Sequence, residues 1–277
     1  MKNIYSEILR NKHSRTGGII LTLLLLLCLI LPMFLNTDPL RQDLSNTLDS
    51  INLKHLLGTD SLGRDNFIRL LTATRHSLFI SLTAALCSVF IGLTIGVVSG
   101  LSGTKTDFAV MRFSDIFLAF PKFFVFILML GFTEFSFARF IFVLAILSWM
   151  EPAKIIRTEI KTIKGSLYYH AAICQGLHPF KIFRSLLLPN IIGIATASFA
   201  LQTSSMIIIE SGLSFLGLGV QPPQISLGTL LNQARTYPID NYSLILQTGF
   251  FIVITVLAFH LLGDGLRDVI SKERFQK

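Results

Sequence analysis

The sequence has few charged residues and few cysteines for its length. Only 14% of its 277 residues are charged, whereas an ordinary soluble domain has about 25%, and the mean hydropathy is +0.65. The three cysteines, Cys28, Cys87 and Cys174, lie far apart in or near apolar stretches and form no CxxC pair. The composition therefore argues against a soluble domain, and the cysteine spacing argues against a disulfide framework or a structural zinc site.

Catalytic signatures are also missing. There is no HExxH, no GxSxG and no Gly-x4-Gly-Lys-Ser/Thr, so zinc proteolysis, the usual serine hydrolysis and ATP binding within this chain lack their residues. No apolar stretch has paired carboxylates at its centre, which disfavours a carrier with an intramembrane proton relay. We treat the six histidines as isolated residues, and we predict no metal site and no cofactor in this chain.

Long uncharged stretches are what the sequence does contain. Residues 16–37 are long enough to cross a hydrocarbon core of about 30 Å as a helix. The bases before this run resemble a signal peptide, but the run is longer than a usual signal core and lacks an A-x-A-like exit, so we expect a retained first span. Three further spans are predicted at residues 77–104, 185–209 and 241–263. Gly92, Gly96 and Gly100 form a repeated GxxxG, which predicts a face for close helix packing.

Two shorter apolar blocks, residues 123–133 and 140–150, predict a helical hairpin. With it, the fold class is an all-α membrane protein with six transmembrane helices. Residues 1–50 would hold the cytoplasmic N-terminus and the first span, and residues 51–277 would form a core of five spans. The uncharged stretch 211–234 is rich in glycine and proline, which predicts an irregular loop.

The basic residues predict the orientation. If the N-terminus is inside, most of the bases fall in cytoplasmic segments, so both termini are expected in the cytoplasm. The net charge of +8 is then a consequence of membrane topology. We therefore predict contact with the lipid bilayer and no nucleic-acid partner.

The basic loop at about residues 164–190 predicts a helix-turn-helix outside the bilayer. Ser166 can cap a helix over residues 167–175, Gly176 suits its end, and a second helix can run from Pro179 to Pro189. Small side chains at Ala171 and Ala172 would let the first helix enter a groove on another protein. An ordinary amphipathic connector at the membrane surface fits the same periodicity.

The spacing of this loop resembles the EAA loop of ABC importer permeases, E-A-A-x3-G-x9-I-x-L-P. The matching residues are His170, Ala171, Ala172, Gly176, Leu186, Leu188 and Pro189. Five segments resemble the C-type second subunit of dipeptide, oligopeptide and nickel permeases: HLLGTDSLGRD from His55, MRFSDIFLAFP from Met111, LLLPN from Leu186, ESGLSFLGLGVQPP from Glu210 and HLLGDGLRD from His260. The resemblance covers the chain from about residue 50 to its end.

This resemblance implies a type I importer permease with a cytoplasmic coupling helix, in a bacterial plasma membrane. The implied partners are a homologous second permease, two cytoplasmic ATPases that bind ATP and Mg²⁺, and an extracytoplasmic binding protein. Larger residues at Ala171 or Gly176 should uncouple ATP hydrolysis from transport. Oligopeptides, dipeptides, nickel and metal chelates (metallophores) all stay open as substrates.

Two residues depart from the family pattern. His170 stands where the family has Glu, and Ile173 stands where a basic residue is usual. A charge contact with the ATPase is therefore lost or changed. Either His170 makes coupling weakly pH-sensitive, or it is a neutral replacement.

Two segments are expected outside the membrane. The first contains Gly58, Asp60, Gly63, Arg64 and Asp65, which suit either a self-satisfied structural loop or docking of the binding protein. The second follows the fifth span and contains Glu210, Gly217 and Gly219. The resemblance implies that this loop lies near the translocation path, with a role in gating rather than in direct solute contact. Glu210 is equally consistent with a helix-end acid that reaches water or a backbone N–H.

Two other functional classes remain. A secondary carrier or channel would work without ATPases. An intramembrane enzyme would need a catalytic pair, and the sequence offers none that we can identify.

Overall fold

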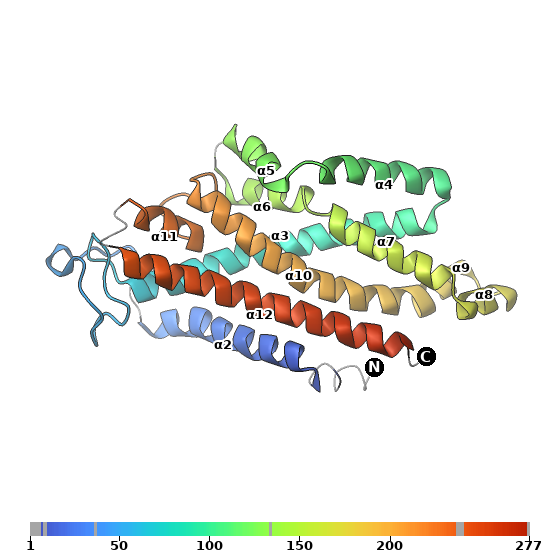
Figure 1. The fold of residues 1–277 in the computed structure, drawn as a ribbon, viewed down its shortest axis with the longest axis horizontal. Coiled ribbons are helices and arrows are strands. Elements are labelled where there is room, and N and C mark those ends of the chain that lie inside the picture. The colour runs from blue at the N-terminus through green and yellow to red at the C-terminus, as the bar shows by residue number, and fades with distance from the viewer. Residues whose placement is uncertain (1–6, 8–9, 36–37, 133–134, 237–240, 276–277) are drawn as a thin grey trace.

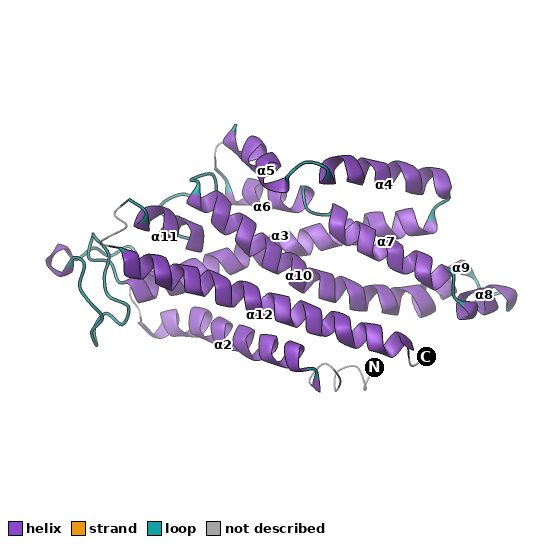
Figure 2. Cartoon of the chain, in the orientation of Figure 1, coloured by secondary structure: helices purple, strands orange, loops and turns teal. Residues whose placement is uncertain are grey.

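The structure of the chain is a computed structural model that describes residues 7, 10–35, 38–132, 135–236 and 241–275. Over these residues the regular secondary structure is helical, apart from an isolated β-bridge between Thr59 and Asp65 (Figure 2). Four helices are apolar and long enough to cross a bilayer. They are α2 (Lys12–Leu35), α3 (Asn66–Leu101), α10 (Leu188–Phe215) and α12 (Tyr242–Phe275).

These four helices correspond to four of the six predicted spans, with different limits. Asn36 and Thr37, at the end of the first predicted span, lie outside the described residues. α3 begins well before the predicted residue 77, and α12 continues well beyond residue 263. α3 can start early because Asp65 caps it, accepting hydrogen bonds from the backbone N–H groups of Phe67 and Ile68.

Glycines bring several of these helices into backbone contact. A Cβ added at Gly17 of α2 would lie 2.7 Å from the carbonyl oxygen of Ala258 in α12. On α3, a Cβ at Gly96 would lie 2.7 Å from the carbonyl oxygen of Ala153, and Gly92 and Gly100 meet the same neighbour, α7 (Met150–Lys164). The packing face predicted from the repeated GxxxG is therefore confirmed, and α7 is its partner.

The predicted hairpin is a broken region. α4 (Thr104–Leu118) and α5 (Lys122–Gly131) are bent by 81° relative to each other, because Pro121 between them has no N–H to continue a helix. α5 and α6 (Phe137–Ile146) have 10 residues each, which reach about 15 Å or half a hydrocarbon core. The described residues thus contain four full-length spans, or five if α4 and α5 count as one. Thr133 and Glu134 lie outside the described residues.

The prediction of an irregular loop over residues 211–234 is wrong for much of that stretch. α10 continues to Phe215, and α11 (Leu227–Ala234) begins with a capping box between Ser226 and Thr229. Only residues 216–226 are irregular. Gly228 lies inside a helix because α11 packs closely on α10: a Cβ there would be 2.2 Å from the carbonyl oxygen of Ser211.

The two ends of the molecule carry different segments (Figure 1). α8 (Leu167–Cys174) and α9 (Pro179–Ile182) lie at one end, together with the start of α2 and the end of α12. Residues 38–65 and α11 lie at the opposite end. The basic loop and the predicted outer segments are therefore separated by the length of the bundle.

Candidate functional site

The predicted short helix in the basic loop is present as α8. Ser166 occupies its N-cap position, but the Ser166 hydroxyl donates to the carbonyl oxygen of Ile163 at 2.5 Å and makes no capping bond. At the other end, Gly176 has φ +71, its N–H bonds the carbonyl of Ile173, and the N–H of Leu177 bonds the carbonyl of Ala172. This pair of bonds is a Schellman motif, which explains why a glycine is needed there.

The surface of α8 is mostly exposed and partly apolar. Leu167 is 88% exposed, and Tyr168 and Ile173 are about half exposed. Ala171 is exposed as well, but Ala172 is only 6% exposed and packs inside the chain. The predicted pair of small residues therefore does not form one docking face, because adjacent positions on a helix point in different directions.

The second helix of the predicted helix-turn-helix is not separate. α9 continues through a π-helical turn (Phe183–Leu187) into α10, so that one unbroken helix runs from Pro179 to Phe215. The prediction that it ends at Pro189 is wrong. The N–H of Leu188 bonds the carbonyl of Phe183, five residues back, and such a widened turn accommodates the missing N–H of Pro189.

The charges around α8 are all basic. The sequence has no Asp or Glu between Glu159 and Glu210, and His170, Lys181 and Arg184 are exposed. The His170 ring lies 6.1 Å from the ring of Tyr169. α8 and the residues that follow it thus present apolar and basic side chains.

An ion-pair cluster that the sequence analysis missed holds the neighbouring helices together. Asp107 of α4 accepts hydrogen bonds from Ser99 of α3 (2.6 Å) and from Arg157 and Lys161 of α7. Arg157 and Lys161 are four residues apart on one helix face, which was the signal available in the sequence. The cluster fixes α4 to the helix that leads into α8.

At the opposite end, Asp60 organises the outer loop. It accepts hydrogen bonds from the backbone N–H groups of Leu62 and Arg64 (2.9 Å each) and from the Arg64 side chain (2.7 Å). It also pairs with Arg69, which is fully buried and contacts Gln233. Gly63 has φ +69, and a Cβ there would lie 1.8 Å from the carbonyl oxygen of Asp43.

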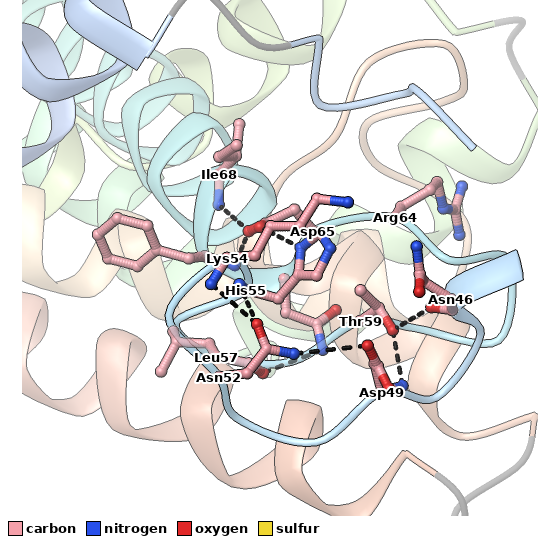
Figure 3. Close-up of polar contacts among 12 residues, drawn as sticks. Asn46, Asp49, Asn52, Lys54, His55, Leu57, Thr59, Arg64, Asp65 and Ile68 are labelled. Atoms are coloured by element: carbon pink, nitrogen blue, oxygen red, sulfur yellow. Dashed lines mark hydrogen bonds and ion pairs between the residues drawn. The ribbon is translucent and has the colours of Figure 1, made fainter. Parts of the chain in front are cut away.

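Asp65 closes the same loop (Figure 3). Its carboxylate accepts hydrogen bonds from the N–H groups of Phe67 and Ile68 and lies 2.8 Å from Nδ1 of His55. Gly58, with φ +75, provides the turn between them. The structure brings together all five residues predicted in this segment. Asp60 pairs with Arg64, and Asp65 pairs with His55 and two backbone N–H groups, as a self-satisfied loop requires.

The outer loop nevertheless exposes apolar side chains. Leu53 is 100% exposed, and Leu44 and Ile51 are exposed by about 70%. Near them, hydrogen bonds from Ser45 and Asn46 lower the pKa of Asp43 to about 2. The polar residues of this loop shape it, whereas its apolar residues face outward.

Glu210 is not at the end of its helix. It lies within α10, which ends at Phe215, and it is 0% exposed. The hydroxyls of Ser77 and Ser214 each donate to its carboxylate at 2.8 Å, and among the described residues no ion pair to it is seen. The prediction of a helix-end acid that reaches water is therefore wrong, because serine hydroxyls satisfy this carboxylate inside the bundle.

Gly217 and Gly219 lie just beyond this carboxylate. Gly217 has φ +81 and ends α10 in a second Schellman motif, with its N–H on the carbonyl of Ser214 and the N–H of Leu218 on that of Leu213. A pocket of about 190 Å³ opens beside this turn. Its lining includes Ser136, Arg139, Gly217 and Gln221.

The histidines are less isolated than the sequence analysis assumed. Nε2 of His260 lies 3.5 Å from Asp264 on the same face of α12, and His170 precedes Cys174 by one turn of α8. In the described part of the chain, no group of three or more His, Cys, Asp or Glu side chains could hold a metal ion.

Comparison with known proteins places the chain in a family. The family described as the binding-protein-dependent transport system inner membrane component matches residues 92–276. The chain belongs to this permease family. The permease is 34% identical over 268 residues to the oligopeptide transport system permease protein OppC of Haemophilus influenzae, covering 95% of the permease and 85% of the relative. It is also 34% identical over 258 residues to the nickel transport system permease protein NikC of Escherichia coli, covering 92% of each.

Other relatives and solved structures agree with this. The dipeptide transport system permease protein DppC of Bacillus subtilis is 33% identical over 271 residues, covering 98% of the permease and 85% of the relative. A chain of the inward-facing MetNI methionine ABC transporter superposes with a TM-score of 0.57 at 18% identity, covering 73% of the permease and 96% of that chain. A chain of an amino acid ABC transporter gives 0.56 at 15% identity, covering 75% and 94%. The permease therefore has the fold of ABC transporter membrane subunits.

Proposed function

We propose that this permease is the membrane subunit of an ATP-driven, binding-protein-dependent importer of peptides, nickel or metal chelates. A homologous second permease completes the translocation path, and an extracytoplasmic binding protein delivers the solute. Two cytoplasmic ATPases, which the permease family implies, bind ATP and Mg²⁺. The names of the relatives support oligopeptides, dipeptides and nickel as substrates.

The observation that carries this proposal is the exposed helix α8. It is short, partly apolar and ended by Gly176, and it leads into a helix that runs unbroken to the opposite end of the bundle. We infer that α8 is the coupling helix, with Ala171, Ile173 and Gly176 on the ATPase side. His170, Leu188 and Pro189 flank this contact, and Ala172 supports it from within.

The distribution of bases supports the orientation. With α8 in the cytoplasm, Lys181 and Arg184 face the cytoplasm, and both termini of the permease lie on that side of a bacterial inner membrane. Six spans result if α4–α5 and α6–α7 each cross the membrane once. The first of them lies in residues 1–50 and the other five in residues 51–277.

We assign two roles to the outer end of the permease, which carries residues 38–65 and the segment after α10. The exposed apolar side chains of residues 38–65 form the docking surface for the binding protein, and the hydrogen bonds of Asp60, Arg64 and Asp65, with turns at Gly58 and Gly63, fix its shape. The segment after α10, with Gly217 and Gly219, serves the outer gate.

Co-purification with a matched pair of variants tests the proposal. The tagged permease is co-expressed with its neighbouring genes, and Ile173→Asp on α8 is compared with Ile51→Asp at the opposite end, which is also exposed. We expect Ile173→Asp to lose the ATPases and to keep the second permease, whereas Ile51→Asp keeps both. If the permease purifies without ATPases and still moves solute in liposomes, it is a secondary carrier or channel instead.

A further inference from the structure

The buried carboxylate of Glu210 connects, through two serines, to Val220 in the irregular segment after α10 and to Leu227 at the start of α11. Ser214 donates to Glu210 and accepts a hydrogen bond from the N–H of Val220 at 3.1 Å. Ser77 of α3 donates to Glu210 and accepts from the N–H of Leu227 at 3.1 Å. Each serine has a single proton and gives it to the carboxylate. One side chain thereby ties Val220 and Leu227, on either side of the turn, to two membrane-spanning helices.

Close backbone contacts surround the same point. A Cβ at Gly219 would lie 2.2 Å from the hydroxyl oxygen of Ser214, and a Cβ at Gly228 would lie 2.6 Å from its Cβ. Ser214 is therefore enclosed by the segment on one side and by α11 on the other. The segment cannot leave α10 without breaking the hydrogen bonds to these serines.

The position of Glu210 couples the outer pocket to movement of α10. Glu210 lies near the far end of the unbroken helix from Pro179 to Phe215, and the segment that it holds forms part of the wall of the outer pocket. A tilt of that helix would move the pocket wall with it. An acid inside a membrane bundle is costly unless it is satisfied and is commonly functional.

We propose that Glu210 is a positioning residue of the transport cycle, which locks residues 216–226 to α3 and α10 so that movement of α10 reaches the outer pocket. This inference rests on the proposed function for the motion that drives α10. The lock itself is a property of this chain and can be measured without ATPases.

Two buried cysteine reporters test the lock. Val220→Cys and Leu227→Cys are placed, one at a time, in a background without Cys28, Cys87 and Cys174, and are labelled in membranes with an impermeant maleimide. Both positions are almost fully buried, so labelling reports opening. Gln224→Cys, which is exposed, confirms the amount and sidedness of each variant.

Glu210→Gln should raise the labelling rate by about tenfold at the reporter whose serine then faces the amide N–H₂, because that group cannot accept a serine proton and one lost hydrogen bond shifts an opening equilibrium by about that factor. Ser214→Ala should raise labelling chiefly at Val220→Cys, and Ser77→Ala chiefly at Leu227→Cys. The matched control is Ser81→Ala: Ser81 lies one turn further along α3 and is equally buried, and its hydroxyl has no hydrogen-bond partner among the described residues. It should change neither rate.

Unchanged labelling in Glu210→Gln at normal expression would overturn the proposal. Equal effects of Ser81→Ala and Ser77→Ala would also overturn it, since the response would then be general loosening. If Glu210→Gln is not recovered in the membrane, the two serine variants test the proposal by themselves: each should raise labelling chiefly at its own reporter. Failure of ATPase binding to α8 would remove only the driving motion and leave this pattern intact.

Discussion

α8 and α10 end in the same backbone motif, but the two ends lie in opposite surroundings. Gly176 and Gly217 both have positive φ and both close a Schellman motif. Beside Gly217, the carboxylate of Glu210 and the glycines 219 and 228 hold the chain against its own helices. Beside Gly176, half-exposed apolar and basic side chains have no such cover. The turn after α10 is thus packed against the permease itself, whereas the turn after α8 leaves apolar side chains exposed.

The largest effect should come from disturbing the tight packing of α11 on α10. Gly228→Ala places a Cβ 2.2 Å from a backbone oxygen of Ser211, and such overpacking costs about 1–3 kcal/mol or more. We expect a clear fall in the thermal unfolding midpoint of the detergent-solubilised permease. Gly249→Ala on α12 is the control, because nothing lies within 4 Å of its added Cβ. Equal midpoints for the two variants would show that the contact between α10 and α11 is not tight.

The second largest effect is expected at Gly176, where a substitution should reduce coupling to the ATPases more than it reduces stability. An added Cβ at Gly176 meets no atom of the permease within 4 Å, but a β-branched residue is strained at φ +71. We expect Gly176→Val to lower solute-stimulated ATPase activity at least about tenfold, since the left-handed conformation costs about 1–2 kcal/mol. Gly176→Asn should keep more activity, because Asn tolerates this conformation. Normal transport by a well-expressed Gly176→Val would remove Gly176 from the coupling contact.

A smaller effect is expected at the exposed tip of the outer loop. Leu53 is fully exposed, so Leu53→Asp should change stability by less than about 0.5 kcal/mol. We expect it to weaken stimulation of ATP hydrolysis by the loaded binding protein while basal hydrolysis stays the same. Leu53→Met, which preserves an apolar side chain, should behave like the wild type. Full stimulation of Leu53→Asp would show that the apolar tip does not dock the binding protein.

The smallest effect concerns Asp43 and pH. The hydrogen bonds from Ser45 and Asn46 need the ionised carboxylate, and they lower the pKa of Asp43 to about 2. Because folding lowers this pKa, these hydrogen bonds stabilise the loop at pH values above the ordinary pKa near 4. Their contribution to stability is lost as the pH falls toward 2. Hydrogen exchange over residues 43–63 at pH 5 and at pH 2 should show this loss, and Asp43→Asn should reduce the difference. If Asp43→Asn shows the same difference in hydrogen exchange between pH 5 and pH 2 as the wild type, other acids of the loop cause that difference.

The sequence predicted best the features that depend on local patterns. Uncharged runs located four full-length spans, the repeated GxxxG located the packing face on α3, and the position of Gly176 matched a helix end. Each of these signals lies within a short stretch of chain. The same local signals could not show that Ala172 points inward, because its burial depends on tertiary packing.

The errors arose where a long-range partner decides the outcome. Glu210 was taken as a helix boundary, but Ser77, far away in the sequence, satisfies it inside the bundle. Arg69 is likewise fully buried within α3, where Asp60 and Gln233 are its partners. A charged residue marks the end of a span only when water solvates it. Sequence periodicity does not show whether a distant side chain pairs with it inside the bundle instead. The predicted hairpin is a broken region because Pro121 interrupts the helix between α4 and α5.

Crosslinking from α8 tests the central claim most directly. In the background without native cysteines, Ala171→Cys is exposed on α8, while Ala172→Cys is the adjacent position and is buried. With the neighbouring genes co-expressed, we predict that Ala171→Cys forms a crosslink to an ATPase subunit and that Ala172→Cys does not. Absence of any crosslink from Ala171→Cys in a permease that still transports solute would contradict the assignment of α8 as the coupling helix.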